Sequence, residues 1–315
     1  MKPRPRAFVT GVRGFTGRYL AEELHRAGYE VFGSARTAHG DRIPGVTSVY
    51  ACDILDGPGL ERVLDEVKPD VVAHLAGVAF VAHGDAEAIY RANLLGSRSL
   101  LDALSRVGAP VRSVLMASSA NVYGNTTGGT LDETAPPSPV NDYAVSKLAM
   151  EYMTKLYSDK LPIVIARPFN YTGVGQSEQF LLPKIVSHFK RRATVIELGN
   201  LDVARDFSDV RTVAQIYRKL LETPATAGET YNVCSGRAYT LDEVLSLARE
   251  ISGHDIDVRV NPAFVRAHEV KKLIGSRVKL ENTIGEVSAV PLSETLRWML
   301  GEVSGSVLDS VEKER

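Results

Sequence analysis

Tyr143, Lys147 and Ser119 are the residues of this sequence whose types and spacing best suit chemistry at a carbonyl group. Tyr143 and Lys147 are four positions apart, so a helix places them on one face. Lowering the pKa of a phenol from ~10 by three units requires about 4 kcal/mol. An ammonium ~5 Å away supplies roughly 3 kcal/mol of this in an effective dielectric of ~20, and the positive charge of an oxidised cofactor could add the remainder. We therefore expect Tyr143 to exchange a proton with a substrate oxygen, with its pKa lowered by Lys147.

Ser119 strengthens this interpretation because it follows a strand-like run, Leu115–Ala117, at the start of a loop. A hydroxyl at that point can hydrogen-bond the same carbonyl oxygen that Tyr143 protonates. An isolated Tyr-Lys pair would be better explained by an amphipathic helix, and Ser119 alone by an ordinary loop serine. The combination favours a catalytic trio.

A glycine-rich turn near the N-terminus predicts a phosphate site. It follows the strand-like run Ala7–Thr10, opens a helix, and consists of Gly11, Val12, Arg13, Gly14, Phe15, Thr16 and Gly17. Glycines let backbone N–H groups approach a pyrophosphate, and the third glycine lets helix and strand pack closely. The same glycines could mark a plain tight turn. Their position between a strand and a helix favours a dinucleotide cofactor.

The end of the second predicted strand indicates which dinucleotide is bound. An NAD site usually places an acid there, whereas this sequence has Arg36, and Arg13 lies in the glycine turn. Two guanidinium groups suit a 2′-phosphate, so NADPH is expected to be preferred, with NADH possible. Either arginine could instead be solvated.

Further cofactor contacts are expected after the third and fourth strands. Asp53, followed by Ile54, could accept a hydrogen bond from the adenine amino group, or could simply cap a helix. Leu75, Ala76 and Gly77 are small or apolar, as a backbone passing a bound cofactor requires. Tight packing alone would explain these three residues equally well.

The elements that must position these residues alternate along the first half of the chain. Apolar runs predict strands at Ala7–Thr10, Glu30–Gly33, Thr47–Tyr50, Val71–His74, Ser113–Ala117 and Ile163–Ala166. Amphipathic stretches predict helices at Gly17–Arg26, Gly59–Val67, Ala86–Arg106 and Tyr143–Tyr157. This alternation predicts an α/β fold, a Rossmann-type doubly wound parallel sheet.

The alternation weakens after Pro168, which suggests a division of the chain. We expect a cofactor domain at residues 1–168 and a smaller α/β substrate lobe at residues 169–300, interleaved with the last strands of the sheet. Residues 301–315 form a polar tail.

Composition excludes several other classes of protein. The 37 Lys and Arg residues balance 38 Asp and Glu residues, which argues against nucleic-acid or anionic-membrane partners. Cys52 and Cys234 have no zinc spacing, and the seven histidines lack metal-binding patterns, so no metal is expected. No signal peptide or membrane span is recognisable, which predicts a cytoplasmic protein.

Several motifs together resemble one known family. They are the glycine turn, His74–Gly77, Asn93, Ser119 with Tyr123-Gly124, Tyr143xxxLys147 and Arg167-Pro168-Phe169-Asn170. This set is similar to the extended short-chain dehydrogenase/reductases that act on nucleotide sugars. The resemblance implies that Ser119, Tyr143 and Lys147 are catalytic, that Tyr143 and Lys147 also contact the cofactor, and that Ser119 and Asn170 contact the substrate.

The second half of the chain resembles the branch of this family that acts on GDP-mannose derivatives. The runs that carry the resemblance are Leu198–Asp202, Arg205–Phe207 and Arg266–Glu269. It implies that Arg205 holds the diphosphate of a GDP-sugar, and that Arg266 and Glu269 hold its nucleotide end. Lys184 is a further phosphate candidate. Glu269 and Lys184 could instead be solvated helix positions.

The identity of residue 121 narrows the choice among the reactions of this family. Two residues after Ser119, the GDP-mannose 4,6-dehydratases carry a basic glutamate and the fucose-synthase-like epimerases a cysteine, whereas this chain has Asn121. The remaining resemblance is to the GDP-4-keto-6-deoxy-mannose reductases, which form GDP-D-rhamnose. It implies that NADPH reduces a C4 ketone, of a hexose or a heptose. A GDP-sugar 4,6-dehydratase or C4-epimerase is the alternative, and a non-catalytic dinucleotide-sensing protein is an alternative of another class.

The family resemblance also suggests an assembly. The predicted helices Ala86–Arg106 and Tyr143–Tyr157 carry apolar faces, which in this family often form a four-helix dimer interface. Burial of the same faces within one chain is the other explanation.

Overall fold

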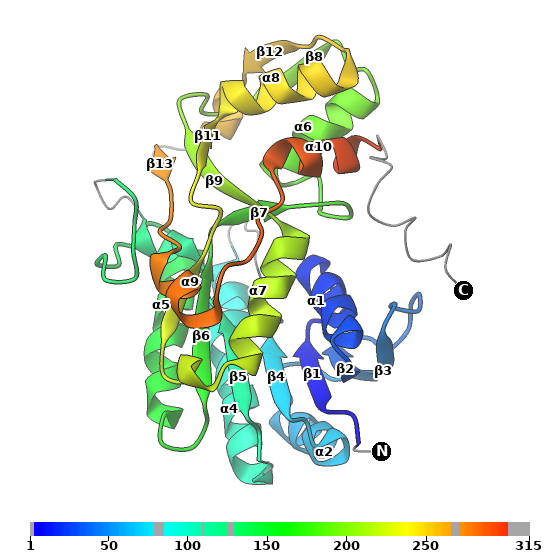
Figure 1. The fold of residues 1–315 in the computed structure, drawn as a ribbon, viewed down its shortest axis with the longest axis vertical. Helices are drawn as coiled ribbons and strands as arrows, with labels where there is room; N and C mark the ends of the chain where they lie inside the picture. Colours follow the sequence, from blue (N-terminus) through cyan, green and yellow to red (C-terminus); the bar gives the residue numbers. More distant parts are fainter. Residues whose placement is uncertain (1–2, 79–84, 109, 125–128, 266–270, 302–315) are drawn as a thin grey trace.

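The computed structural model describes residues 3–78, 85–108, 110–124, 129–265 and 271–301. Its centre is a parallel sheet of seven strands in the order β10-β6-β5-β4-β1-β2-β3 (Figure 1). The strands are β1 (Arg6–Thr10), β2 (Glu30–Ala35), β3 (Val46–Ala51), β4 (Val71–His74), β5 (Ser113–Ala117), β6 (Ile163–Pro168) and β10 (Thr230–Val233). The α/β Rossmann-type fold predicted from the sequence is confirmed.

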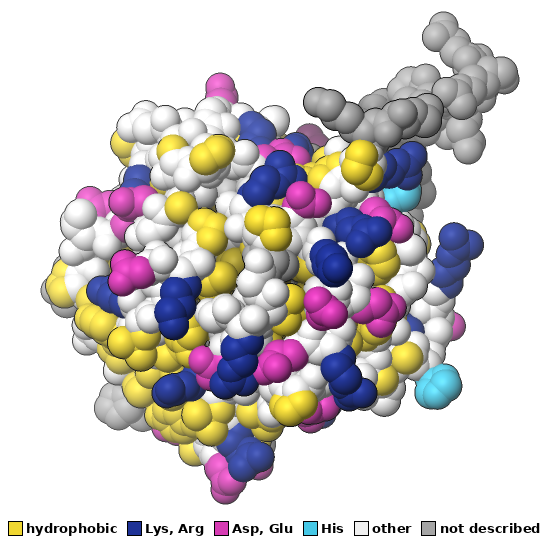
Figure 2. Space-filling model, turned by 90° about the horizontal axis from the view of Figure 1, so that it is seen from below, with side chains coloured by type: hydrophobic (Ala, Val, Ile, Leu, Met, Phe, Trp, Pro, Cys, Tyr) yellow, Lys and Arg dark blue, Asp and Glu magenta, His cyan; other side chains and the backbone are white. Residues whose placement is uncertain are grey.

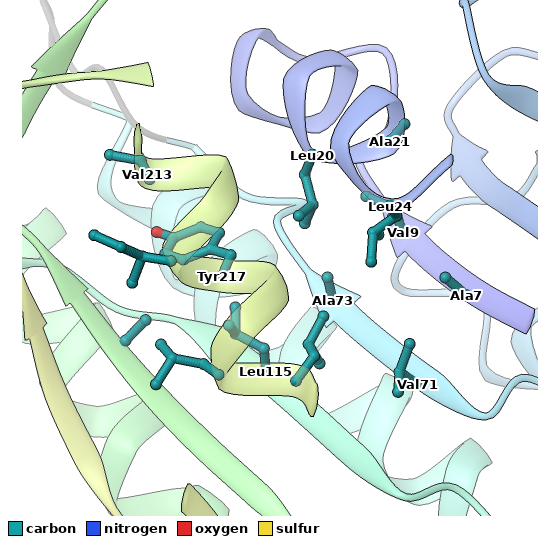
Figure 3. Packing of buried hydrophobic residues seen from close by; sticks show 14 of the residues in the cluster. Ala7, Val9, Leu20, Ala21, Leu24, Val71, Ala73, Leu115, Val213 and Tyr217 are labelled. Atoms are coloured by element: carbon teal, nitrogen blue, oxygen red, sulfur yellow. The ribbon is translucent and has the colours of Figure 1, made fainter. Parts of the chain in front are cut away.

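Helices cover both faces of this sheet because alternate strand residues point to opposite sides. Ala7 and Val9 of β1 pack under α1 (Phe15–Arg26) and α7 (Val210–Glu222), whereas Phe8 packs on the other side. Figure 3 shows side chains of α1 and α7 meeting over β1, β4 and β5. The second face is covered by α2 (Gly57–Val67), α4 (Gly96–Val107) and α5 (Asp142–Thr154).

The helix expected at Ala86–Arg106 has an internal irregularity. It begins as α3 (Ala86–Tyr90), continues through a π-helical turn at Arg91–Leu95, and ends as α4. Such turns carry one extra residue and often occur at functional sites. Asn93 lies in this turn and is completely buried.

The remaining elements form a smaller layer beyond the carboxyl ends of the strands (Figure 1). A four-stranded sheet contains β7 (Asn170–Thr172), β9 (Ala204–Asp209), β11 (Ala238–Thr240) and β13 (Lys272–Leu273), and β8 (Val195–Leu198) pairs with β12 (Asp257–Val260). The helices of this layer are α6 (Leu181–Lys190), α8 (Leu241–Ser252) and α10 (Leu292–Leu300), which share one apolar core. The short helix α9 (Val278–Ile284) instead packs against β10 of the large sheet.

The chain passes between the two layers more than once. After β9 it returns to the large sheet, where α7 packs against α1 and β10 pairs with β6. None of the helices in the described ranges is long and apolar enough to cross a membrane.

Candidate active site

Tyr143, Lys147 and Ser119 meet at the carboxyl edge of the large sheet. The side chain of Asn141 caps α5 by accepting a hydrogen bond from the Ala144 amide at 2.9 Å, which fixes the first turn where Tyr143 lies. Lys147 is buried and its Nζ donates to the Ala117 carbonyl at the end of β5, at 2.9 Å. Ser119 follows that strand end and is hydrogen-bonded to Tyr143.

The electrostatics of the trio differ from the expectation. Burial raises the pKa of Tyr143 to about 12, while the hydrogen bond to Ser119 acts in the opposite direction. Burial also lowers the pKa of Lys147 to about 8, and Glu151 opposes that shift. In the protein by itself the pKa of Tyr143 is therefore raised rather than lowered, because desolvation outweighs the hydrogen bond with Ser119. The phenol is held in its protonated form.

The glycine turn has the geometry of a phosphate cradle. Gly11 has a φ of +70°, and a Cβ there would lie 2.9 Å from the Ala76 amide nitrogen. A Cβ on Gly17 would lie 2.4 Å from the Gly11 carbonyl oxygen. Gly14 is the N-cap residue of α1 and has no side chain in the way. The backbone amides at the helix start are thus left open to an anion.

Phe15 and Thr16 connect this turn to the second layer. The ring of Phe15 stacks on Tyr171 with centroids 6.1 Å apart, and the Thr16 hydroxyl lies 2.7 Å from the Tyr171 hydroxyl. Tyr171 is one residue after Asn170, so the glycine turn contacts the direct neighbour of an expected substrate residue.

Arg13 and Arg36 lie beside the end of β2, as a 2′-phosphate site requires. Arg13 donates to the carbonyls of Ala38 at 2.6 Å and Asp41 at 3.0 Å, and its buried Nε has no hydrogen-bond partner among the described residues. A cavity of about 210 Å³ adjoins it. Arg36 is exposed. An unpartnered buried N–H is costly, so these residues fit a cofactor that brings an anionic acceptor.

The other expected cofactor residues line the same edge of the sheet. Asp53 is exposed, and one of its carboxylate oxygens accepts from the Leu55 amide at 2.9 Å, so it also stabilises a turn. The side chain of Ile54 packs against Gly96. A Cβ on Gly77 would lie 3.5 Å from the Lys147 Nζ, which puts the end of β4 next to the trio. Leu75 and Ala76 border Gly11.

The expected substrate residues lie in the second layer. Asn170 is exposed at the start of β7 and pairs with Phe207 of β9, two residues after Arg205. Arg205 donates to the carbonyls of Ala204 and Lys271 at 3.0 and 3.2 Å. These two residues therefore lie on neighbouring strands.

Lys184 is engaged within its own lobe. Its Nζ donates to the Glu197 carbonyl at 2.7 Å and lies 4.2 Å from the centroid of the Phe264 ring. Burial lowers the pKa of its ammonium. Arg266 and Glu269 lie outside the described residues.

Sequence reasoning missed a buried polar network behind the trio. Glu151 of α5 and Arg167 of β6 form an ion pair at 2.6 Å. The available signal was Arg167, a charged residue that directly follows the apolar run Ile163–Ala166, since a buried charge requires a partner. The described residues contain no cluster of ligands for a metal ion.

Comparisons with known proteins agree with this geometry. Residues 7–234 match the NAD dependent epimerase/dehydratase family. A GDP-6-deoxy-D-talose 4-dehydrogenase from Aggregatibacter actinomycetemcomitans is 35% identical, over 88% of this chain and 90% of that protein. A GDP-6-deoxy-D-mannose reductase from Pseudomonas aeruginosa is 33% identical, over 94% of this chain and 96% of that protein.

Solved structures show the same relationship. A Burkholderia cenocepacia protein provisionally described as an epimerase is 53% identical, with a TM-score of 0.88 over 96% of this chain and 99% of that one. The RMD protein of Pseudomonas aeruginosa, determined in complex with NADPH, is 31% identical, with a TM-score of 0.82 over 95% and 97%. The chain therefore belongs to the NAD dependent epimerase/dehydratase family, as its motifs predicted.

Proposed function

We propose that this protein uses NADPH to reduce the C4 ketone of a GDP-4-keto-6-deoxy-sugar. The observation that carries the proposal is the protonated phenol of Tyr143, hydrogen-bonded to Ser119 and backed by Lys147. Reduction of a ketone needs an acid, and a pKa of about 12 keeps this acid loaded. Two relatives that are 33% and 35% identical are named for chemistry of GDP-6-deoxy-sugars.

The residues of the trio have separate tasks in this mechanism. Ser119 donates a hydrogen bond to the C4 oxygen and stabilises the negative charge that develops there. Tyr143 lies beside Ser119 and transfers its proton to the same oxygen. Lys147 would hold the nicotinamide ribose of bound NADPH, and its ammonium lowers the cost of the phenolate that remains on Tyr143. NADPH supplies the hydride when it is bound.

We assign Arg13 and Arg36 to the 2′-phosphate, and Asn170, Arg205 and Lys184 to the GDP-sugar. The unpartnered Nε of Arg13 supports the first assignment. For the second, Asn170 and Arg205 lie on adjacent strands of the layer above the trio. This division corresponds to a cofactor part up to residue 168 and a GDP-sugar part that begins after it. A cytoplasmic location fits, because NADPH is supplied there.

The two relatives are named for GDP-sugars that differ in configuration at C4, since 6-deoxy-talose and 6-deoxy-mannose are C4 epimers. The decisive experiment couples this protein to a GDP-mannose 4,6-dehydratase with NADPH and identifies the product by NMR. A GDP-6-deoxy-hexose is expected, and the C4 proton couplings distinguish the epimers. A GDP-heptose series run in parallel tests the longer sugar. Formation of a ketone from GDP-mannose alone, without added reductant, would contradict the proposal and indicate a dehydratase.

We also propose that two copies associate through α4 and α5. Tyr152 of α5 and Leu156 in the 3-10 turn that follows it, Lys155–Tyr157, are 58% and 72% exposed. Figure 2 shows apolar side chains gathered on the lower left of the face that it presents. Leu95, at the start of α4, is 47% exposed. Pairing these helices in a four-helix bundle would cover the three exposed side chains. Light scattering should give twice the mass of one chain, and Leu156→Glu should give a monomer. A monomeric wild-type protein would refute the interface.

A further inference from the structure

The ion pair of Glu151 and Arg167 lies directly behind the proposed catalytic trio. Arg167 Nε donates to Glu151 Oε1 at 2.9 Å, and Nη2 donates to Oε2 at 2.6 Å. Both side chains are less than a tenth exposed. Burying two charges has a large desolvation cost, so such a pair is weak evidence for a contribution to stability alone. Its other contacts indicate a second role.

The pair holds the loop that carries Ser119 on both sides. Before Ser119, the Ser118 hydroxyl donates to Glu151 Oε1. After it, Arg167 Nη1 donates to the Tyr123 hydroxyl at 2.9 Å, and the guanidinium lies 4.9 Å from the centroid of the Tyr123 ring. The position of Ser119 is therefore determined by contacts to one buried unit.

Glu151 also acts on Lys147, which is one helical turn earlier. Lys147 donates to the carbonyl of Ala117, so the two side chains of α5 hold consecutive residues, Ala117 and Ser118. Two titratable groups interact electrostatically with Lys147, Glu151 on the same helix and His74 on β4, and Arg167 of β6 is paired with Glu151. His74 is neutral, because burial and Lys147 lower its pKa to about 3. Burial lowers the pKa of Lys147 to about 8, and the Glu151 carboxylate counteracts this.

We propose that Glu151 and Arg167 are positioning residues for the reduction: they fix Ser119 beside Tyr143, and Glu151 keeps Lys147 charged. This inference rests on the proposed function. Glu151 and Arg167 themselves make no contact with the reacting atoms. Their effect passes through Ser119 and Lys147.

The first test removes the link to Ser119 and leaves the ion pair intact. Ser118→Ala should lower kcat about 5- to 20-fold, with the KM for NADPH and the melting temperature nearly unchanged. In a Ser119→Ala background, Ser118→Ala should cause no further loss, because its effect acts through Ser119. Ser252→Ala removes a comparable hydroxyl contact in α8, to the Ala248 carbonyl at 2.7 Å, and should leave kcat unchanged. An unchanged kcat in Ser118→Ala, or losses that simply multiply, would overturn this role.

The second test changes the charge near Lys147. Glu151→Gln should move the alkaline limb of kcat/KM to lower pH by about one unit or more, since Lys147 loses an opposite charge. The pH dependence of NADPH affinity, measured by fluorescence, should shift in the same direction. This second readout needs no sugar, so it separates failure of the inference from failure of the proposed substrate.

A double variant distinguishes positioning from a purely structural role. Glu151→Gln with Arg167→Met removes both buried charges, and it should recover stability while the alkaline limb stays shifted. Glu23→Gln, which breaks the remote pair with Arg218, should leave the pH profile unchanged. A wild-type alkaline limb in Glu151→Gln, or its restoration in the double variant, would refute the role of Glu151.

Discussion

Tyr143→Phe is the most direct perturbation of the proposed reduction, because it removes the acid and little else. With a pKa of about 12, only about one phenol in 10⁵ is ionised at pH 7, so nearly every molecule carries the proton that the C4 oxygen needs. General acid catalysis contributes about 10²- to 10⁴-fold, and kcat should fall by that factor. The Kd for NADPH should change by less than about threefold, since Lys147 and the glycine turn remain.

The assay follows NADPH absorbance at 340 nm with the enzymatically prepared GDP-4-keto-6-deoxy-sugar, and fluorescence titration gives the Kd. Tyr157→Phe is the matched control. It also removes a largely buried hydroxyl on the same helical segment, one that donates to Asp102 at 2.7 Å. This variant should keep wild-type kcat. A kcat within tenfold of wild type in Tyr143→Phe would refute the assignment of the acid.

The pH dependence of the two directions adds an independent check. Oxidation of the product alcohol needs the phenolate, which becomes more abundant as pH rises. Its rate should increase about tenfold per pH unit below the pKa of Tyr143 in the bound complex. The reduction uses the phenol and should show no such increase. An oxidation rate that does not rise between pH 6 and 7, below the range in which Lys147 loses its charge, would contradict the role of Tyr143.

Three further predictions follow from other parts of the structure. Gly11→Ala should lower the free energy of unfolding by about 1–3 kcal/mol and abolish NADPH binding, because the added Cβ meets the backbone of Ala76. The control Gly228→Ala has the same positive φ without that contact, and it should retain NADPH binding. In the folded protein, burial lowers the pKa of His74 from the ordinary value of 6.5 to about 3. The free energy of unfolding should therefore fall by about 1.4 kcal/mol per pH unit as the pH drops from 6.5 to 3. His74→Asn should flatten that slope in acid denaturation. Arg13→Ala should lower kcat/KM for NADPH at least tenfold and leave NADH nearly unaffected; equal losses for both cofactors would refute the assignment.

Local patterns were sufficient to predict much of the cofactor half. The runs Val71–His74 and Ser113–Ala117 are strands with the expected bounds, because buried parallel strands are continuously apolar. The pattern did not indicate β10, which contains Asn232 and is four residues long. It also predicted one continuous helix where the π-turn at Arg91–Leu95 interrupts it, since one extra residue barely disturbs the periodicity.

Local patterns predicted which residues meet at the site, but not the electrostatics of the site. Spacing along α5 was enough to bring Tyr143 next to Lys147, and the strand end placed Ser119 within reach. The direction of the tyrosine pKa depends on desolvation, which only the packed structure determines. Glu151 and Arg167 are distant in sequence from Ser118, so their network could not be derived from local patterns.

Helix α7 and strand β10 come late in the sequence although they complete the layer that begins with β1. This order affects both the folding of the chain during synthesis and the design of chimeras. During synthesis, the sheet that begins at residue 6 cannot be completed until residues 210–233 have left the ribosome. A fragment that stops at Pro168 would leave the β6 edge unpaired and the apolar surface under α7 bare, which favours aggregation. Chimeras that exchange cofactor preference between relatives must therefore transfer this second segment together with the first.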